Sequence, residues 1–258
     1  MKGLAVLGLL AVLLSIGAPV AAAPELTLSV AVSMKEAVEE IGRRFLEGRP
    51  GVTLRYNFGA SGELQKQIEA GAPVDVFVSA AQRQVDELER AGLLLASTRR
   101  VFASNVLVAI RPTDSPLDVP GPSDLLDRRV QRIAIGNPKT VPAGQYAEES
   151  LRSLNLWDRV RPRLIFAENV RQVLDYVVRG EVDIGFVYAT DAVQRLGRVR
   201  LAFAFSDDTH RPILYPAAVV KATRAPEPAR AFVEFLVSPA AQAVLKRLGF
   251  EPAPTGGR

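Results

Sequence analysis

The chain of 258 residues contains no cysteine, and it has only one histidine, one tryptophan and two methionines. The absence of cysteine excludes disulfides, zinc–thiolate sites, thiol catalysis and the attachment of a lipid to an N-terminal cysteine. A single histidine also leaves little for a metal centre of the zinc type, because such a site needs several ligands. The sequence therefore points away from thiol and zinc chemistry.

Sequence motifs of several enzyme classes are also missing. The chain has neither a P-loop nor the dinucleotide-binding pattern Gly-x-Gly-x-x-Gly. A nucleophile elbow, Gly-x-Ser-x-Gly, is not formed around Ser61, because Glu63 stands where the second glycine is needed. An exported hydrolase that uses Ser33 or Ser61 with His210 stays an alternative, but the residues favour a protein that is not an enzyme.

Residues 1–22 are predicted to be a signal peptide. A lysine precedes the short apolar run 4–14, and small residues fill positions 20–23. We place the cleavage after Ala22, because cleavage one residue later would put Pro24 directly after the break. No later stretch is long and apolar enough to span a membrane. The mature chain is therefore predicted to be periplasmic and soluble, with no stable membrane insertion after signal removal.

The charge pattern bears on possible partners. Thirty-two lysine and arginine residues stand against 28 acidic residues, which gives a net charge of +4. Both signs are mixed along the chain, and no basic stretch with interleaved aromatic residues is present. The composition therefore argues against nucleic acid as a partner.

Predicted strands and helices alternate along the rest of the chain. Strands are predicted at 26–32, 52–58, 74–79, 106–110, 132–136, 164–166, 182–188, 199–205 and 213–220. Helices are predicted at 34–46, 63–70, 82–91, 123–128, 144–154, 170–179, 191–196, 227–236 and 240–248. This alternation predicts an α/β fold with mainly parallel sheets flanked by helices. Two similar lobes with a ligand cleft between them are favoured, since candidate ligand groups spread from residue 33 to 188 and ligands bind beyond the carboxyl ends of such strands.

Serines begin two consecutive predicted helices. Ser33 follows the strand 26–32, and Ser61 follows the strand 52–58. The unpaired N–H groups of a helix start bind anions, so serines placed there without a catalytic partner indicate an anion site. Either serine could instead be a helix cap, and Ser33 with Glu36 forms a capping-box pattern.

Three further groups lie at similar positions. The sequence Val-Pro-Ala-Gly at 141–144 opens a helix, which leaves the N–H of Ala143 unpaired. Asn169 is a predicted cap, with the N–H of Val170 exposed just after it. Tyr188 ends a strand and could donate its hydroxyl into a cleft. Taken singly, these are also ordinary helix starts and packing positions.

Several segments together resemble the periplasmic molybdate-binding proteins of ABC importers, which have the type II periplasmic-binding fold. The similarity runs from about residue 26 to residue 250. Its most specific parts are QIEAGAPVDVFVSA (67–80), GNPKTVPAGQYAEESL (136–151), AENVRQVL (167–174), GFVYATDAV (185–193) and RLGF (247–250). The resemblance implies a monomeric binding protein without a cofactor, which delivers molybdate or tungstate to an ABC permease and its ATPase subunit.

The resemblance also implies which groups hold the ion. These are the hydroxyls of Ser33, Ser61 and Tyr188 and the N–H groups of Ala143 and Val170, which would contact the molybdate oxygens with no direct metal ligand. All are neutral donors aided by helix dipoles. A protonated oxyanion would leave its O–H unpaired, at a cost of about 1–3 kcal/mol. A binding protein for sulfate, thiosulfate or phosphate remains the close alternative.

The same resemblance implies how the chain divides. Lobe 1 would comprise residues 23–104 and the return segment 213–258, and lobe 2 residues 105–212. The lobes would close over the ion, because the ion contacts both lobes only when they are closed.

A transferase with the same two-lobed fold is a further alternative, although the known example attaches its cofactor through cysteine, which this chain lacks.

Overall fold

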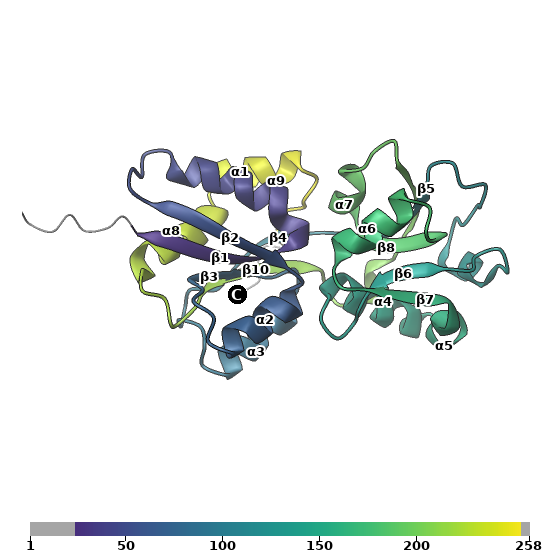
Figure 1. Cartoon of the computed structure of the whole chain (residues 1–258), viewed down its shortest axis with the longest axis horizontal. Coiled ribbons are helices and arrows are strands. Elements are labelled where there is room, and N and C mark those ends of the chain that lie inside the picture. The colour runs from purple at the N-terminus through teal and green to yellow at the C-terminus, as the bar shows by residue number, and fades with distance from the viewer. Residues whose placement is uncertain (1–23, 254–258) are drawn as a thin grey trace, which may run out of the picture.

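A computed structural model of the chain describes residues 24–253. The predicted signal peptide, and with it the cleavage site, lies outside the described residues. Two groups of helices and strands lie side by side, each built around a five-stranded sheet (Figure 1). We call the group around the first sheet lobe 1 and the other lobe 2. The predicted lobe boundaries at 104/105 and 212/213 fall in the segments that cross between the sheets, and they stay a prediction. No helix in the described part could cross a membrane.

The sheet of lobe 1 has the strand order β2-β1-β3-β10-β4. Its strands are β1 (Glu25–Ala31), β2 (Thr53–Gly59), β3 (Val76–Val78), β4 (Arg100–Ser104) and β10 (Leu214–Val219). The helices of this lobe are α1 (Lys35–Leu46), α2 (Ser61–Glu69), α3 (Gln82–Arg90), α8 (Pro226–Leu236) and α9 (Pro239–Arg247), with a 3-10 turn Val32–Met34 before α1. In Figure 1, α1 and α9 lie on one side of the sheet, and α2 and α3 lie on the other.

The sheet of lobe 2 has the order β7-β6-β8-β5-β9. Its strands are β5 (Leu107–Pro112), β6 (Ile133–Gly136), β7 (Leu164–Ala167), β8 (Ile184–Tyr188) and β9 (Val199–Ala204). The helices are α4 (Pro142–Ser153), α5 (Trp157–Val160), α6 (Val170–Val178) and α7 (Ala189–Val193). Short 3-10 turns are formed by Pro122–Leu126, Arg161–Arg163 and Asp207–Thr209.

Both sheets are mixed but mainly parallel, as predicted, because four of the five strands in each sheet run in the same direction. In lobe 1, β1 is parallel to β2 and β3, whereas β10 is antiparallel to β3 and β4. In lobe 2, β6 is parallel to β7 and β8, whereas β5 is antiparallel to β8 and β9. The reversed strand of each sheet, β5 or β10, is the first strand after the chain crosses from the other lobe. Such a strand enters its sheet from the side of the other lobe, so it runs against the strands that end there.

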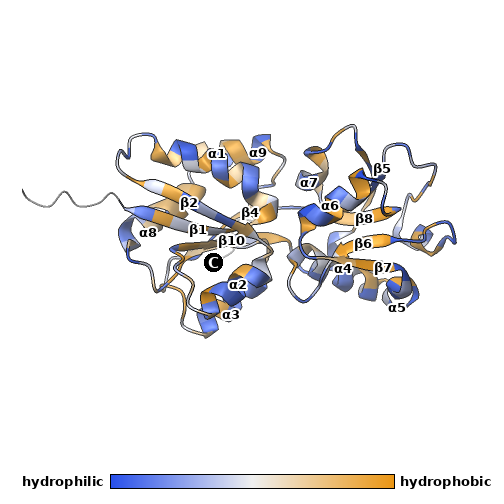
Figure 2. Cartoon of the chain, in the orientation of Figure 1, coloured by the Kyte–Doolittle hydropathy of each residue, from blue (hydrophilic) through white to orange (hydrophobic). Residues whose placement is uncertain are grey.

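Apolar strands form the centre of each lobe. Every residue of β8 and of β10 is buried, and β8 is coloured largely as hydrophobic in Figure 2. Runs of this kind are typical of strands covered by helices on both faces. The two covered sheets act as rigid supports, so the segments that follow their strands are held in fixed positions.

Candidate functional site

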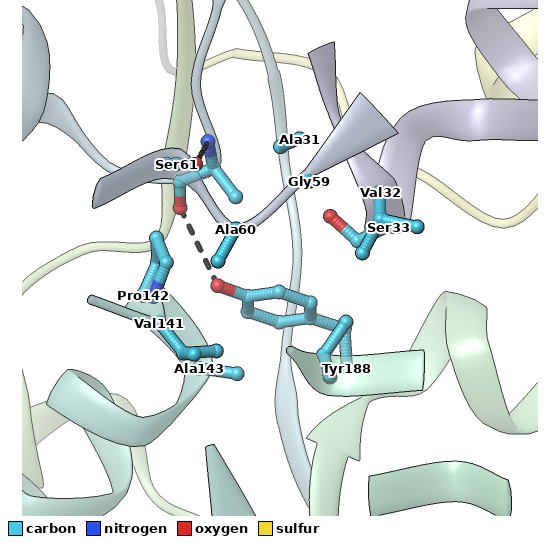
Figure 3. A pocket seen from close by; sticks show the side chains of 12 residues that line it. Ala31, Val32, Ser33, Gly59, Ala60, Ser61, Val141, Pro142, Ala143 and Tyr188 are labelled. Carbon is cyan, nitrogen blue, oxygen red and sulfur yellow. Dashed lines mark hydrogen bonds between the residues drawn. The ribbon is translucent and has the colours of Figure 1, made fainter. Parts of the chain in front are cut away.

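A small cleft lies between the lobes (Figure 3). Its lining consists of Ala31, Val32, Ser33, Gly59, Ala60, Ser61, Ala80, Val141, Pro142, Ala143, Val170 and Tyr188. All five residues that the sequence singled out are therefore brought to one place. They come from the starts of the helical segments that follow β1, β2, β6 and β7, and from the end of β8. Their role in binding an ion stays a prediction.

The electrostatics of the cleft come from the backbone. None of the described residues that line it has a charged side chain. Three helices begin at the cleft, since Ser61 is the first residue of α2, Pro142 the first of α4 and Val170 the first of α6. Each helix start carries a partial positive charge and unpaired N–H groups. The arrangement therefore suits an anion, which would be held by hydrogen bonds rather than by an ion pair.

Ser33 brings a buried hydroxyl to the cleft. The residue is buried, and its Oγ has no hydrogen-bond partner among the described residues. The expected capping box does not form, because Ser33 lies inside the 3-10 turn before α1 and its side chain does not cap the helix. A buried hydroxyl without a partner costs about 1–3 kcal/mol. A ligand in the cleft would supply the missing partner.

Ser61 and Tyr188 both form hydrogen bonds with the backbone of Ala80. The Ser61 Oγ accepts a hydrogen bond from the Ala80 N–H at 3.0 Å, which leaves the serine proton available for donation. The Tyr188 hydroxyl donates weakly to the Ala80 carbonyl at 3.4 Å, and its ring extends into the space that Ser33 also faces in Figure 3. Burial raises the pKa of Tyr188 well above its ordinary value. Its hydroxyl therefore keeps its proton and can act as a donor.

Ala143 and Val170 offer backbone donors. Ala143 is the second residue of α4 and Val170 the first of α6, so both N–H groups fall among those that a helix leaves unpaired. Asn169 is confirmed as the cap of α6, since its Oδ1 accepts from the Gln172 N–H at 3.0 Å. The Asn169 side chain therefore pairs with the N–H of Gln172. The N–H of Val170 remains available to a ligand.

A charged network that was not predicted from the sequence lies next to the cleft. Asp191, in α7, is fully buried, and its Oδ2 accepts a long hydrogen bond of 3.3 Å from the Tyr188 N–H. Its Oδ1 lies 3.0 Å from Nε of Arg171. One signal was present in the sequence: Arg171 is the second residue of a helix, where a positive charge is unfavourable unless a carboxylate is near.

Asp191 is expected to make the free energy of unfolding depend on pH. Burial raises its pKa to about 6, although the charge of Arg171 and the Tyr188 N–H act in the opposite direction. Glu36 also faces the group and adds to the increase, and the buried Tyr215 lies near enough to feel its charge. Between the ordinary pKa and 6, the folded state binds more protons than the unfolded state. Stability therefore falls as pH rises through this window.

The measurement is denaturant unfolding of the wild type and of Asp191→Asn between pH 4 and pH 7. The difference in unfolding free energy between the two proteins should change by about 2–3 kcal/mol between pH 4 and pH 6 and stay level above pH 6.5. Other carboxylates titrate in both proteins, so their effects cancel in the difference. Parallel pH profiles would show that Asp191 titrates as an ordinary carboxylate.

His210 is not placed for catalysis. Its Nδ1 faces the carbonyl of Arg211 at 2.8 Å, and its ring packs near Tyr146. His210 is absent from the cleft lining that holds Ser33 and Ser61. No group of three or more metal-ligating side chains occurs within residues 24–253. The cleft thus lacks the nucleophile–base pair that a hydrolase needs.

Comparisons with known proteins identify the family and the fold. A Bacillus subtilis protein named as a candidate ABC transporter substrate-binding lipoprotein is 39% identical, with 87% of this chain and 85% of that protein covered. The molybdate-binding protein ModA of Haemophilus influenzae is 35% identical, with 97% and 99% covered. The solved structure of the periplasmic molybdate-binding protein of Azotobacter vinelandii has a TM-score of 0.78 and 26% identity, with 88% and 99% covered.

These relatives are named as binding proteins rather than enzymes, and they confirm the predicted two-lobed fold. Residues 26–251 match the family described as bacterial extracellular solute-binding protein. The match takes in both sheets and every residue of the cleft lining. This chain belongs to the bacterial extracellular solute-binding protein family.

Proposed function

We propose that this protein captures molybdate, with tungstate as a second ligand, for an ABC importer. The observation that carries the proposal is the chemistry of the cleft, where three hydroxyls and two backbone N–H groups meet at three helix starts. All five groups can donate hydrogen bonds, and a fully ionised oxyanion accepts from every side. The names of the relatives support molybdate as the ion.

The cleft also discriminates by protonation and by size. A protonated oxyanion such as hydrogen phosphate carries an O–H that needs an acceptor, and the lining provides no carboxylate for it. An unpaired buried O–H costs about 1–3 kcal/mol, which is roughly one to two decades in affinity. Sulfate is smaller than molybdate, so donors fixed by helices and strands would reach its oxygens less well.

Calorimetric titration of the ligand-stripped mature protein with molybdate, tungstate, sulfate and phosphate tests the proposal. Tight one-to-one binding of molybdate or tungstate is expected, with sulfate needing far higher concentrations. Tight sulfate or phosphate binding with weak molybdate binding would move the protein to another oxyanion. If none of the four ions binds, the cleft is not an oxyanion site, and its serines and N–H groups are ordinary features of helix starts.

Ser33→Ala and Tyr188→Phe are each expected to weaken molybdate binding by roughly tenfold or more, because a hydrogen bond to a charged group is worth about 1.5–3 kcal/mol. Calorimetry or competition binding gives the affinities. Ser150→Ala is the matched control, since Ser150 is also a buried serine but lies in α4 away from the cleft and accepts from Thr209. Unchanged affinity in both cleft variants would refute the site assignment.

The route of the protein to its site of action is part of the proposal. Cleavage after residue 22 would release it into the periplasm, and the lack of cysteine leaves no residue for the lipid anchor that the name of the Bacillus subtilis relative indicates. The closed, ion-loaded monomer would then dock on the permease, whose ATPase subunit drives uptake.

A further inference from the structure

A hydrogen-bonded charge network connects the two lobes beside the cleft. Arg171 lies in α6 of lobe 2, and its Nη2 is 2.6 Å from Oε2 of Glu36, in α1 of lobe 1. Gln194, just after α7 of lobe 2, donates to the same oxygen at 3.1 Å. It also accepts from Nη1 of Arg171 at 3.3 Å. One carboxylate oxygen of lobe 1 thus receives two donors from lobe 2.

One part of this network lies within lobe 2, and the other part forms only when the two lobes are closed. Asp191 and Arg171 both belong to lobe 2, so their contact of 3.0 Å persists when the lobes separate. Glu36 belongs to lobe 1, so its contacts with Arg171 and Gln194 exist only when the lobes are together. Asp191 is fully buried and the side chain of Arg171 is 16% exposed, whereas that of Glu36 is 38% exposed. Lobe 2 therefore keeps a fixed receptor for a carboxylate that arrives on closure.

Each charged residue of the network lies next to a cleft residue in the sequence or is hydrogen-bonded to one. Glu36 lies one turn after Ser33, and Arg171 directly follows Val170. Asp191 accepts from the N–H of Tyr188. Neither Glu36 nor Arg171 lines the cleft. The network can therefore act on closure without touching the ion.

We propose that Glu36, Arg171 and Gln194 form a latch between the lobes that slows release of the bound ion. Opening of the closed form requires the latch to break, so its loss accelerates dissociation and leaves association nearly unchanged, as expected for a hydrogen-bonded charge pair inside an interface. Which ion is released rests on the proposed function, but the latch acts on the lobes themselves.

The latch makes a prediction opposite to that of simple electrostatics. Removal of the Glu36 charge lowers the negative potential around an anion site, which alone would tighten binding. The latch requires the reverse, namely that Glu36→Gln releases molybdate about fivefold faster or more. Stopped-flow measurement of association and dissociation in the mature protein separates the two effects.

Glu40→Gln is the matched control for Glu36→Gln. Glu40 lies one turn later in α1, and its ion-pair partners Arg44 and Arg247 both belong to lobe 1. The same charge is therefore lost from the same helix without loss of an interlobe contact. The latch is supported if Glu40→Gln releases molybdate at the wild-type rate and Glu36→Gln releases it faster. Equal release rates in the two variants overturn it.

Gln194→Ala and salt dependence give a second test. Gln194→Ala removes one latch donor without a change of charge, and it should accelerate release by less than Glu36→Gln does. Combined with Glu36→Ala, it should add nothing, because that variant has no side-chain oxygen left to accept from Gln194. Release from the wild type should become faster with ionic strength, and release from Glu36→Gln should not. Additive effects in the double variant would contradict a shared latch.

A ligand-free measurement separates the latch from the proposed function. The absence of native cysteine allows two spin labels at introduced cysteines, for example Ala91→Cys in lobe 1 and Asp175→Cys in lobe 2, both at exposed positions. Glu36→Gln should shift the distance distribution toward open lobes, and Glu40→Gln should not. Identical distributions overturn the latch, whereas failure of the wild type to bind any tested oxyanion overturns only the proposed function.

Discussion

Gly144→Ala is expected to lower the free energy of unfolding by about 3 kcal/mol or more. A Cβ atom at this position would lie 1.9 Å from the carbonyl oxygen of Gly136 and 2.5 Å from its carbon. These are backbone atoms of β6, and Gly144 itself lies inside α4, so neither partner can turn away as a side chain could. Without the clash, alanine would stabilise a helix by up to about 1 kcal/mol relative to glycine. The sign of the measured change therefore reports the close approach directly.

Urea unfolding of the variant and the wild type measures this effect. Gly121→Ala is a suitable control, because a Cβ atom there would meet only Oδ2 of Asp124 at 3.5 Å, an ordinary contact. The control should change stability by no more than about 0.5 kcal/mol. A stable Gly144→Ala would mean that α4 does not approach β6 so closely. The placement of the Ala143 N–H at the cleft would then also be wrong.

Local patterns predicted most elements of the fold. The buried run 182–188 and the apolar spacing of 34–46 correspond to β8 and α1 within a few residues. The strand β4, Arg100–Ser104, was missed because it is a short edge strand with polar residues at both ends. The single-turn helix α5, Trp157–Val160, is too short for a periodic pattern. The reversed direction of β5 and β10 was also beyond the pattern, since it depends on where the chain crosses between the lobes.

The candidate site was predictable for a different reason than the latch. Each of the five cleft residues lies at a strand end or a helix start, which are local features, and the family resemblance indicated that they meet. Glu36 and Arg171 are separated by 135 residues, and each alone looks like an ordinary charge on a helix surface. Only the packing of the two lobes reveals that they pair. The position of Arg171 at a helix start was the one local sign of a nearby carboxylate.

Gly62→Ala is expected to weaken molybdate binding by roughly tenfold to 100-fold while the unfolding free energy of the ligand-free protein hardly changes. Gly62 is the second residue of α2 in lobe 1, and its N–H donates to the carbonyl of Thr140 in lobe 2 at 2.9 Å. A Cβ atom there would lie 2.7 Å from that carbonyl oxygen and 2.8 Å from the Thr140 Cα. The clash is again with backbone, but it lies between the lobes.

This difference in location separates Gly62 from Gly144. The two backbones at Gly144 belong to one lobe and cannot separate, so the clash destabilises the fold. The lobes on either side of Gly62 can move apart, so the clash opposes closure and appears as lost affinity, mainly through faster release of the ion. Calorimetry, stopped-flow kinetics and urea unfolding on the same two variants measure both effects. A Gly62→Ala protein that binds normally but unfolds more easily would mean that the lobes do not open, and that the ion enters a cleft already closed.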